Sequence, residues 1–157
     1  MKTITITKSD LDSNNKYKEG FIGTYTEYAD VSVEIAENLG YVMFEKGIYV
    51  NGSIVAKAGS GIKAGWGIEA GSGIKAGSGI VSFYSWIRAK LAIDAKFTIS
   101  AGIFSVNGAQ DIEAQEINGN VIFGNKKLLP KKEESSLIGT LVEVKVGDKT
   151  YKATITE

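Results

Sequence analysis

The side chains that could do chemistry in this chain are carboxylates, lysines and hydroxyls, because it contains neither histidine nor cysteine. Histidine is the commonest metal ligand and the commonest general base near neutral pH. Without these two residues, zinc catalysis and the Ser-His-Asp and Cys-His mechanisms lose their main groups. The sequence therefore predicts a protein that is not an enzyme, with no cofactor and no metal site.

Four acidic residues remain as candidates for hydrolysis: Asp94, Asp111, Glu113 and Glu116. Two-carboxylate hydrolysis needs an acid and a base at a defined separation, and no feature of the sequence pairs these four. The repeated Gly-x-Gly steps match neither a phosphate-binding loop nor a strand–helix dinucleotide motif. We predict no catalytic residues and keep a carboxylate enzyme or small-molecule-binding protein as the third alternative.

Large aromatic residues at two places are the candidates for a binding surface. Trp66 stands where the neighbouring repeat units carry serine. Phe83, Tyr84 and Trp86 fall where a six-residue spacing lengthens to seven, which should turn at least one ring outward. Exposed aromatic residues are enriched at interaction hot spots. The alternatives are that Trp66 packs under a cap and that the cluster shields the core.

Basic residues at outward positions extend this surface. They are Lys57, Lys63, Lys75, Arg88, Lys90 and Lys96. They could attract an acidic protein or a phosphate, or simply keep a flat sheet soluble. Because 18 basic residues balance 18 acidic ones, direct nucleic-acid binding is disfavoured. The predicted partner surface comprises Trp66, Phe83, Tyr84, Trp86, Arg88 and Lys90.

These residues lie on a repeat of the form Ile-x-Ala-Gly-x-Gly that runs from Ile62 to Gly79. Strand alternation places the Ile and Ala of each unit on one side. The glycines allow positive φ and sharp bends. A flexible linker would not place isoleucine at every sixth position, so the pattern predicts an all-β, single-domain β-solenoid of hexad rungs, with an N-terminal β cap and a C-terminal β-hairpin.

Three hexads per coil would stack residues about eighteen apart. The expected inward pairs are Ile62 on Ile80, Ile68 on Ile87 and Ile74 on Ile93. The same register places Glu69 beside Arg88 and Lys75 beside Asp94, pairs of opposite charge. Two slips interrupt it, one before Ile62 and one at 83–86.

Four segments follow from these patterns. An N-terminal cap or first coil occupies 1–46, the solenoid 47–125, a polar linker 126–136 and a β-hairpin 137–157. Within the first segment, Thr3–Lys8, Phe21–Tyr28 and Val31–Ile35 are predicted strands. The hairpin could cap the solenoid, pair with the N-terminal strand or mediate self-association, and the sequence leaves these open.

Over about residues 40–125 the repeat resembles that of uncharacterised bacterial, phage and prophage proteins with tandem G-x-I-x-A-G-W/S units. Ile62-Lys63-Ala64-Gly65-Trp66-Gly67 and the later Ile-Arg-Ala and Ile-Ser-Ala-Gly-Ile-Phe steps carry the resemblance. It implies an inhibitor of host defence, such as an anti-CRISPR protein. The hexad is also similar to that of bactofilins and of left-handed β-helix acyltransferases, but the acyltransferase activity depends on a histidine.

We therefore expect a non-catalytic protein-binding module. Its implied partner is a bacterial defence nuclease such as a CRISPR–Cas effector, inhibited through protein–protein contact. The alternative is a self-assembling β-helix scaffold, and either protein could form a homodimer. The N-terminus lacks an apolar signal region and no uncharged apolar run approaches about 20 residues, so we expect a cytoplasmic protein without membrane contact.

Overall fold

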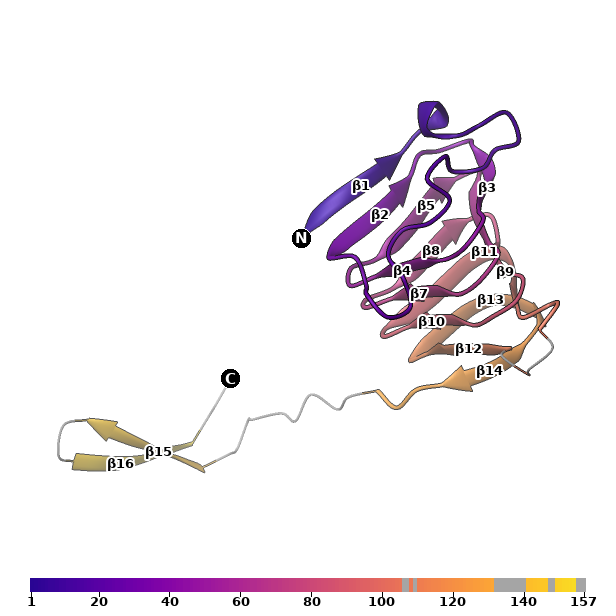
Figure 1. The fold of residues 1–157 in the computed structure, drawn as a ribbon. Coiled ribbons are helices and arrows are strands. Elements are labelled where there is room, and N and C mark those ends of the chain that lie inside the picture. Colours follow the sequence, from indigo (N-terminus) through magenta and orange to yellow (C-terminus); the bar gives the residue numbers. More distant parts are fainter. Residues whose placement is uncertain (106–107, 109, 132–140, 147–148, 155–157) are drawn as a thin grey trace.

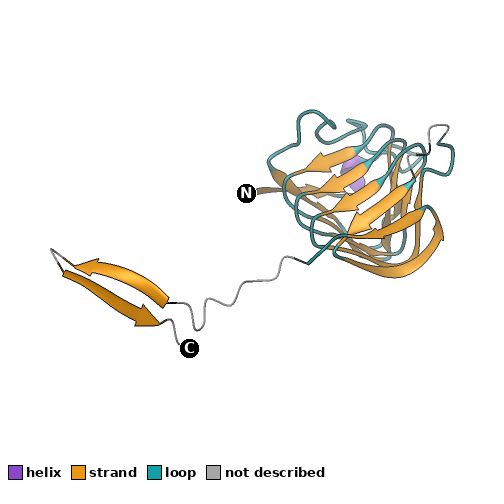
Figure 2. Ribbon diagram, turned by 90° about the horizontal axis from the view of Figure 1, so that it is seen from below, coloured by secondary structure: helices purple, strands orange, loops and turns teal. Residues whose placement is uncertain are grey.

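The computed structural model describes residues 1–105, 108, 110–131, 141–146 and 149–154, the last two ranges by their backbone only. The chain winds into a parallel β-solenoid of about four turns, which confirms the predicted all-β fold class. Figure 1 shows the coils stacked in chain order, from β1 at one end to β13 and β14 at the other. Figure 2 shows the strands joined by short loops at the corners of each coil.

Three faces make up each coil. The first face stacks β1 (Lys2–Ile6), β2 (Val31–Ile35), β5 (Ile54–Ala58), β8 (Ile74–Gly77) and the first parts of β11 (Ala92–Ala101) and β13 (Glu116–Phe123). The second stacks β3 (Gly40–Phe44), β6 (Ser60–Ala64), β9 (Ile80–Ser82) and the later parts of β11 and β13. The third stacks β4 (Ile48–Val50), β7 (Ile68–Ala70), β10 (Ile87–Ala89), β12 (Asp111–Ala114) and β14 (Asn125–Leu128).

The predicted register is confirmed at every pair. Ile62 pairs with Ile80, Ile68 with Ile87, and Ile74 with Ile93, and all six side chains are buried. A buried isoleucine contributes about 1.5–3 kcal/mol through removal from water. These inward columns, closed by alanines two positions on, form the core of the solenoid.

The outward charges are neighbours as predicted, but their contacts differ. Glu69 is opposite Arg88, and Lys75 is opposite Asp94. The Arg88 Nε instead pairs with Glu113 of the following coil, at 3.0 Å. Asp94 accepts a hydrogen bond from the side-chain amide of Asn118 at 2.7 Å. The pattern of opposite charges therefore predicted which residues lie opposite each other on adjacent strands, but not which side chains form ion pairs or hydrogen bonds.

The repeat glycines serve close packing rather than the positive φ expected of them. The glycines with positive φ in the described chain lie outside the hexads, as at Gly59 and Gly102, whereas Gly65 and Gly71 are not among them. A Cβ at Gly65 would collide with the carbonyl oxygen of Glu45, and one at Gly71 with that of Asn51. Each coil therefore contacts the backbone of the preceding coil at its corners, where only glycine leaves room.

The predicted strand Phe21–Tyr28 is wrong. One isolated bridge lies within it, from Ile22 to Ile48, and Gly23 then turns the chain with φ of 65°. A second bridge, from Ala29 to Val50, follows directly after it. The short 3-10 helix η1 (Lys8–Asp10) and the loop after it carry Leu11 and Tyr17. Both side chains are buried, and the ring of Tyr17 lies 5.3 Å from that of Phe44.

The C-terminal segment differs from expectation at its start. β14 occupies the beginning of the predicted linker, because Lys126 and Lys127 pair with Ile112 and Glu113 and extend the third face. The predicted linker residues 132–136 lie outside the described residues. β15 (Leu141–Val146) and β16 (Lys149–Thr154) form an antiparallel two-stranded sheet, while 137–140, 147–148 and 155–157 of the predicted hairpin also lie outside. Within the described part of the chain, no helix has the length and apolar character to cross a membrane.

Candidate binding groove

The corner between the second and third faces carries at least one large side chain in each successive coil. These residues, here called the corner column, are Phe21, Lys46, Trp66, Tyr84 and Phe104. Backbone hydrogen bonds tie the corners together: the Lys46 N–H donates to Gly20 O, and the Trp66 N–H to Lys46 O at 2.7 Å. The column therefore has the spacing of the solenoid itself.

The side chains of the corner column contact one another in two groups, Phe21 with Lys46 and Trp66 with Tyr84 and Phe104. The Lys46 ammonium lies 5.0 Å from the ring centre of Phe21. The rings of Trp66 and Tyr84 are 5.8 Å apart, and those of Tyr84 and Phe104 are 5.9 Å apart. Such aromatic pairs contribute about 0.5–1.5 kcal/mol beyond their burial. The exposed rings thus support one another without a cover.

An apolar groove of about 710 Å³ runs beside the column. Its walls are the column residues together with Tyr25, Tyr49 and Trp86. Trp66, Tyr84 and Phe104 remain 57%, 49% and 58% exposed. Exposed apolar side chains that form one contiguous patch mark a candidate contact site, whereas single exposed ones are common.

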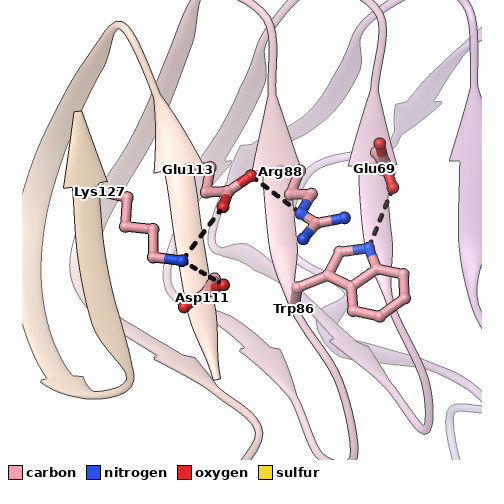
Figure 3. Close-up of polar contacts among 6 residues, drawn as sticks. All are labelled: Glu69, Trp86, Arg88, Asp111, Glu113 and Lys127. Carbon is pink, nitrogen blue, oxygen red and sulfur yellow. Dashed lines mark hydrogen bonds and ion pairs between the residues drawn. The ribbon is translucent and has the colours of Figure 1, made fainter. Parts of the chain in front are cut away.

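Trp86 forms a wall of the groove that is held from two sides (Figure 3). Its indole Nε1 donates to a carboxylate oxygen of Glu69 at 2.9 Å, and the Arg88 guanidinium lies 4.4 Å from its ring centre. Arg88 pairs with Glu113, which Lys127 also approaches. One charged network across neighbouring strands therefore fixes the orientation of a groove residue.

Tyr49 forms the floor near the first coils. Its hydroxyl accepts a hydrogen bond from the Gly67 N–H at 3.0 Å, and its side chain is buried. Burial raises the pKa of the Tyr49 phenol. The ring of Tyr28 lies tilted against this ring, with 5.9 Å between their centres, and the pKa of Tyr28 is also raised, chiefly by burial and then by a hydrogen bond to Glu69. Both phenols are therefore held neutral.

Ser82 anchors the two corners that carry the aromatic residues. It occupies the inward alanine position of its hexad and is fully buried. Its hydroxyl lies 2.6 Å from the Trp66 carbonyl oxygen and 2.9 Å from that of Ser85. Because a buried hydroxyl needs a partner, this contact links the Trp66 corner to the irregular corner at 83–86.

The structure brings most of the predicted surface together. Trp66, Tyr84 and Trp86 line the groove, whereas Phe83 is not part of its lining and stacks on Phe104 with 5.9 Å between the ring centres. Arg88 lies behind Trp86. The exposed Lys90 follows β10 at a different corner and is not a groove residue.

Sequence reasoning missed several groove residues, chiefly Phe21, Tyr25 and Phe104. They come from the loop before the first complete coil and from the corner after the regular hexads, where no repeat spacing places them. Ser82 was also missed, although its departure from the Ile-x-Ala pattern was a visible signal.

The candidate carboxylates all take part in contacts between or along strands. Asp111 accepts from Lys127 at 2.7 Å, and Glu113 pairs with Arg88. Asp94 and Glu116 both accept from the Asn118 amide. In the described ranges no three acidic residues gather where they could hold a metal ion.

The fold defines a β-solenoid repeat protein. Comparisons with protein-family models, curated proteins and solved structures found no match to this chain.

Proposed function

We propose that this β-solenoid is a non-catalytic protein-binding module that contacts its partner through the apolar groove beside the corner column. The observation that carries the proposal is the run of exposed, mutually packed rings of Trp66, Tyr84 and Phe104. Trp and Tyr are the residue types that most often dominate binding energy.

Preorganisation supports the proposal. The rings stand on a parallel β scaffold, and Trp86 is fixed by Glu69 and Arg88. Binding therefore requires little ordering of this surface, which lowers the entropic cost of association. The engagement of the four candidate carboxylates in contacts between or along strands supports a non-catalytic role.

The chemistry of the groove favours a protein segment with apolar side chains. Its lining is almost wholly apolar, with Lys46 as the cationic residue in it. Arg88, which contacts the groove residue Trp86, would form part of the rim, where charge sets association rate more than affinity, whereas Lys90 lies at a different corner. The resemblance of the repeat to phage proteins makes a bacterial defence nuclease the first partner to test, with the cytoplasm as the place of contact.

Affinity capture from a bacterial host tests this function, with wild-type protein, Trp66→Ala and Phe97→Ala as three baits. Phe97 is a matched control, because it is 55% exposed but lies within β11, away from the groove. We expect one protein to be retained by wild type and Phe97→Ala and lost by Trp66→Ala. Equal retention by all three baits would show that the partner binds elsewhere.

Self-assembly into a scaffold is the second candidate, and the exposed last coil favours it. Light scattering separates the two functions. Particles that grow with concentration indicate a scaffold, whereas a monomer or closed dimer agrees with a binding module.

A further inference from the structure

The two ends of the solenoid differ in how their apolar core is covered. At the N-terminal end the chain covers its own core, with Leu11 and Tyr17 buried over the first complete coil. The Tyr17 N–H donates to the Met43 carbonyl at 2.9 Å, and its ring packs on Phe44. The apolar interior at this end is therefore closed by the segment that precedes the first complete coil.

The C-terminal end exposes apolar side chains on its last coil. Ile122 and Leu128 are 61% and 63% exposed, and Phe123 and Leu129 beside them are also exposed. Within the described chain, β13 pairs with β11 and β14 pairs with β12, so the other edge of each strand is unpaired. An open edge with apolar side chains is a site for further strand or side-chain packing.

The hairpin that follows in the chain has a complementary pattern. In its sequence Val142, Val144 and Val146 alternate with Glu143 and Lys145. The period of a strand places the valines on one side, and the backbone register pairs Val142 with Ala153 and Val144 with Tyr151. A two-stranded ribbon is marginally stable alone in water, so this apolar side needs a surface to cover.

The tether is long enough for the hairpin to return to the last coil. Residues 132–140 separate the last described residue of the solenoid from β15. Fully extended, a segment of this length spans about 30 Å. A six-residue strand is about 20 Å long, comparable with the side of a coil. The hairpin can therefore reach every part of the C-terminal end of the solenoid.

We propose that the hairpin β15–β16 folds back onto the C-terminal end of its own solenoid. There its valine side covers Ile122, Leu128 and Leu129. The chain then closes each end with its own terminal segment. This inference concerns the end of the solenoid and does not depend on the groove.

Spin labels test the placement cleanly, because the chain has no cysteine to remove. Labels would be attached to the double variant Leu128→Cys, Val144→Cys of the full chain. We expect one narrow distance distribution below about 20 Å, the length of one coil side, unchanged when unlabelled chain is added in excess. A broad distribution overturns the proposal. A short distance that disappears on dilution also overturns it, because the hairpin would then cover a second copy.

Hydrogen exchange provides an independent readout with matched variants. Val144→Thr should raise the exchange rates of the β13 and β14 amides at least 10-fold, whereas Lys145→Thr should leave them unchanged. Equal rates in the two variants would contradict the proposed packing.

Discussion

The indole nitrogen of Trp86 donates a hydrogen bond to Glu69 in the preceding coil, across 2.9 Å. This contact fixes a wall of the groove through a residue that does not belong to its lining. Glu69→Met should remove the acceptor of both the Trp86 and the Tyr28 hydrogen bonds and lower the free energy of unfolding by about 1–3 kcal/mol. Glu69→Gln keeps an oxygen acceptor and should lose less.

Tryptophan fluorescence measures the same contact directly. In a Trp66→Phe background the emission comes from Trp86, since the chain has two tryptophans. Glu69→Met should shift this emission to longer wavelength as the indole becomes mobile and hydrated. Indistinguishable spectra for the Met and Gln variants would show that the hydrogen bond does not hold the ring.

The repeat consensus and the structure predict different effects for the variant Ser82→Ala. The consensus unit has alanine at this inward position, so a pattern argument predicts a neutral or stabilising change. The structure predicts a loss of about 1–2 kcal/mol, because the hydroxyl between the Trp66 and Ser85 carbonyls is removed. Urea unfolding measures this loss. The control Ser78→Ala, at a partly exposed corner, should have a free energy of unfolding within about 0.5 kcal/mol of wild type. A Ser82→Ala protein as stable as wild type would refute the anchoring role.

The two glycines of one hexad should differ in their tolerance of a methyl group. At Gly71 a Cβ collides with the Asn51 backbone, whereas at Gly73 the nearest atom is the Ala92 oxygen at 3.3 Å. Gly71→Ala should therefore lower the free energy of unfolding by about 1–3 kcal/mol or more, and Gly73→Ala by clearly less. Thermal unfolding of both variants checks the order, and a reversed order would contradict the close packing of coils.

The repeat determined the register because Ile at every sixth position has one way to face inward in a coil of three strands. The neighbours of Ile62, Ile68 and Ile74 in the next coil could therefore be predicted from the repeat spacing alone. The repeat spacing does not predict neighbours where successive coils differ in length. Phe104 joins Tyr84 across a corner of unequal loops, and the loop carrying Phe21 follows no period.

The charged contacts were unpredictable for a different reason. Glu69, Arg88 and Glu113 occupy one outward column, so Arg88 has an acidic neighbour on either side. Register alone does not choose between them. In the structure the Glu69 carboxylate accepts from the Trp86 indole, and Arg88 pairs with Glu113.

Alkaline pH should destabilise the fold through its buried phenols. Burial raises the pKa of Tyr49 above its ordinary value near 10, so the unfolded chain loses this proton first as pH rises. The contribution of the neutral Tyr49 phenol to the free energy of unfolding is complete below about pH 10, and it decreases as the pH rises toward the pKa of Tyr49 in the folded protein. Urea unfolding at pH 8 and pH 10.5 measures it.

Tyr49→Phe provides the control for the alkaline effect. It should be less stable at pH 8, because the Gly67 N–H loses its acceptor, but it should lose less stability between the two pH values. An unchanged pH difference in this variant would assign the effect to other tyrosines.

The dissociation constant of the captured partner tests the central claim most directly. Calorimetric titration should compare wild type, Trp66→Ala, Tyr84→Ala and Phe97→Ala at one salt concentration. If the groove beside the corner column is the contact surface, the first two variants should bind at least about 30-fold more weakly, equivalent to about 2 kcal/mol, with Phe97→Ala unchanged. Wild-type affinity in Trp66→Ala and Tyr84→Ala would contradict the account.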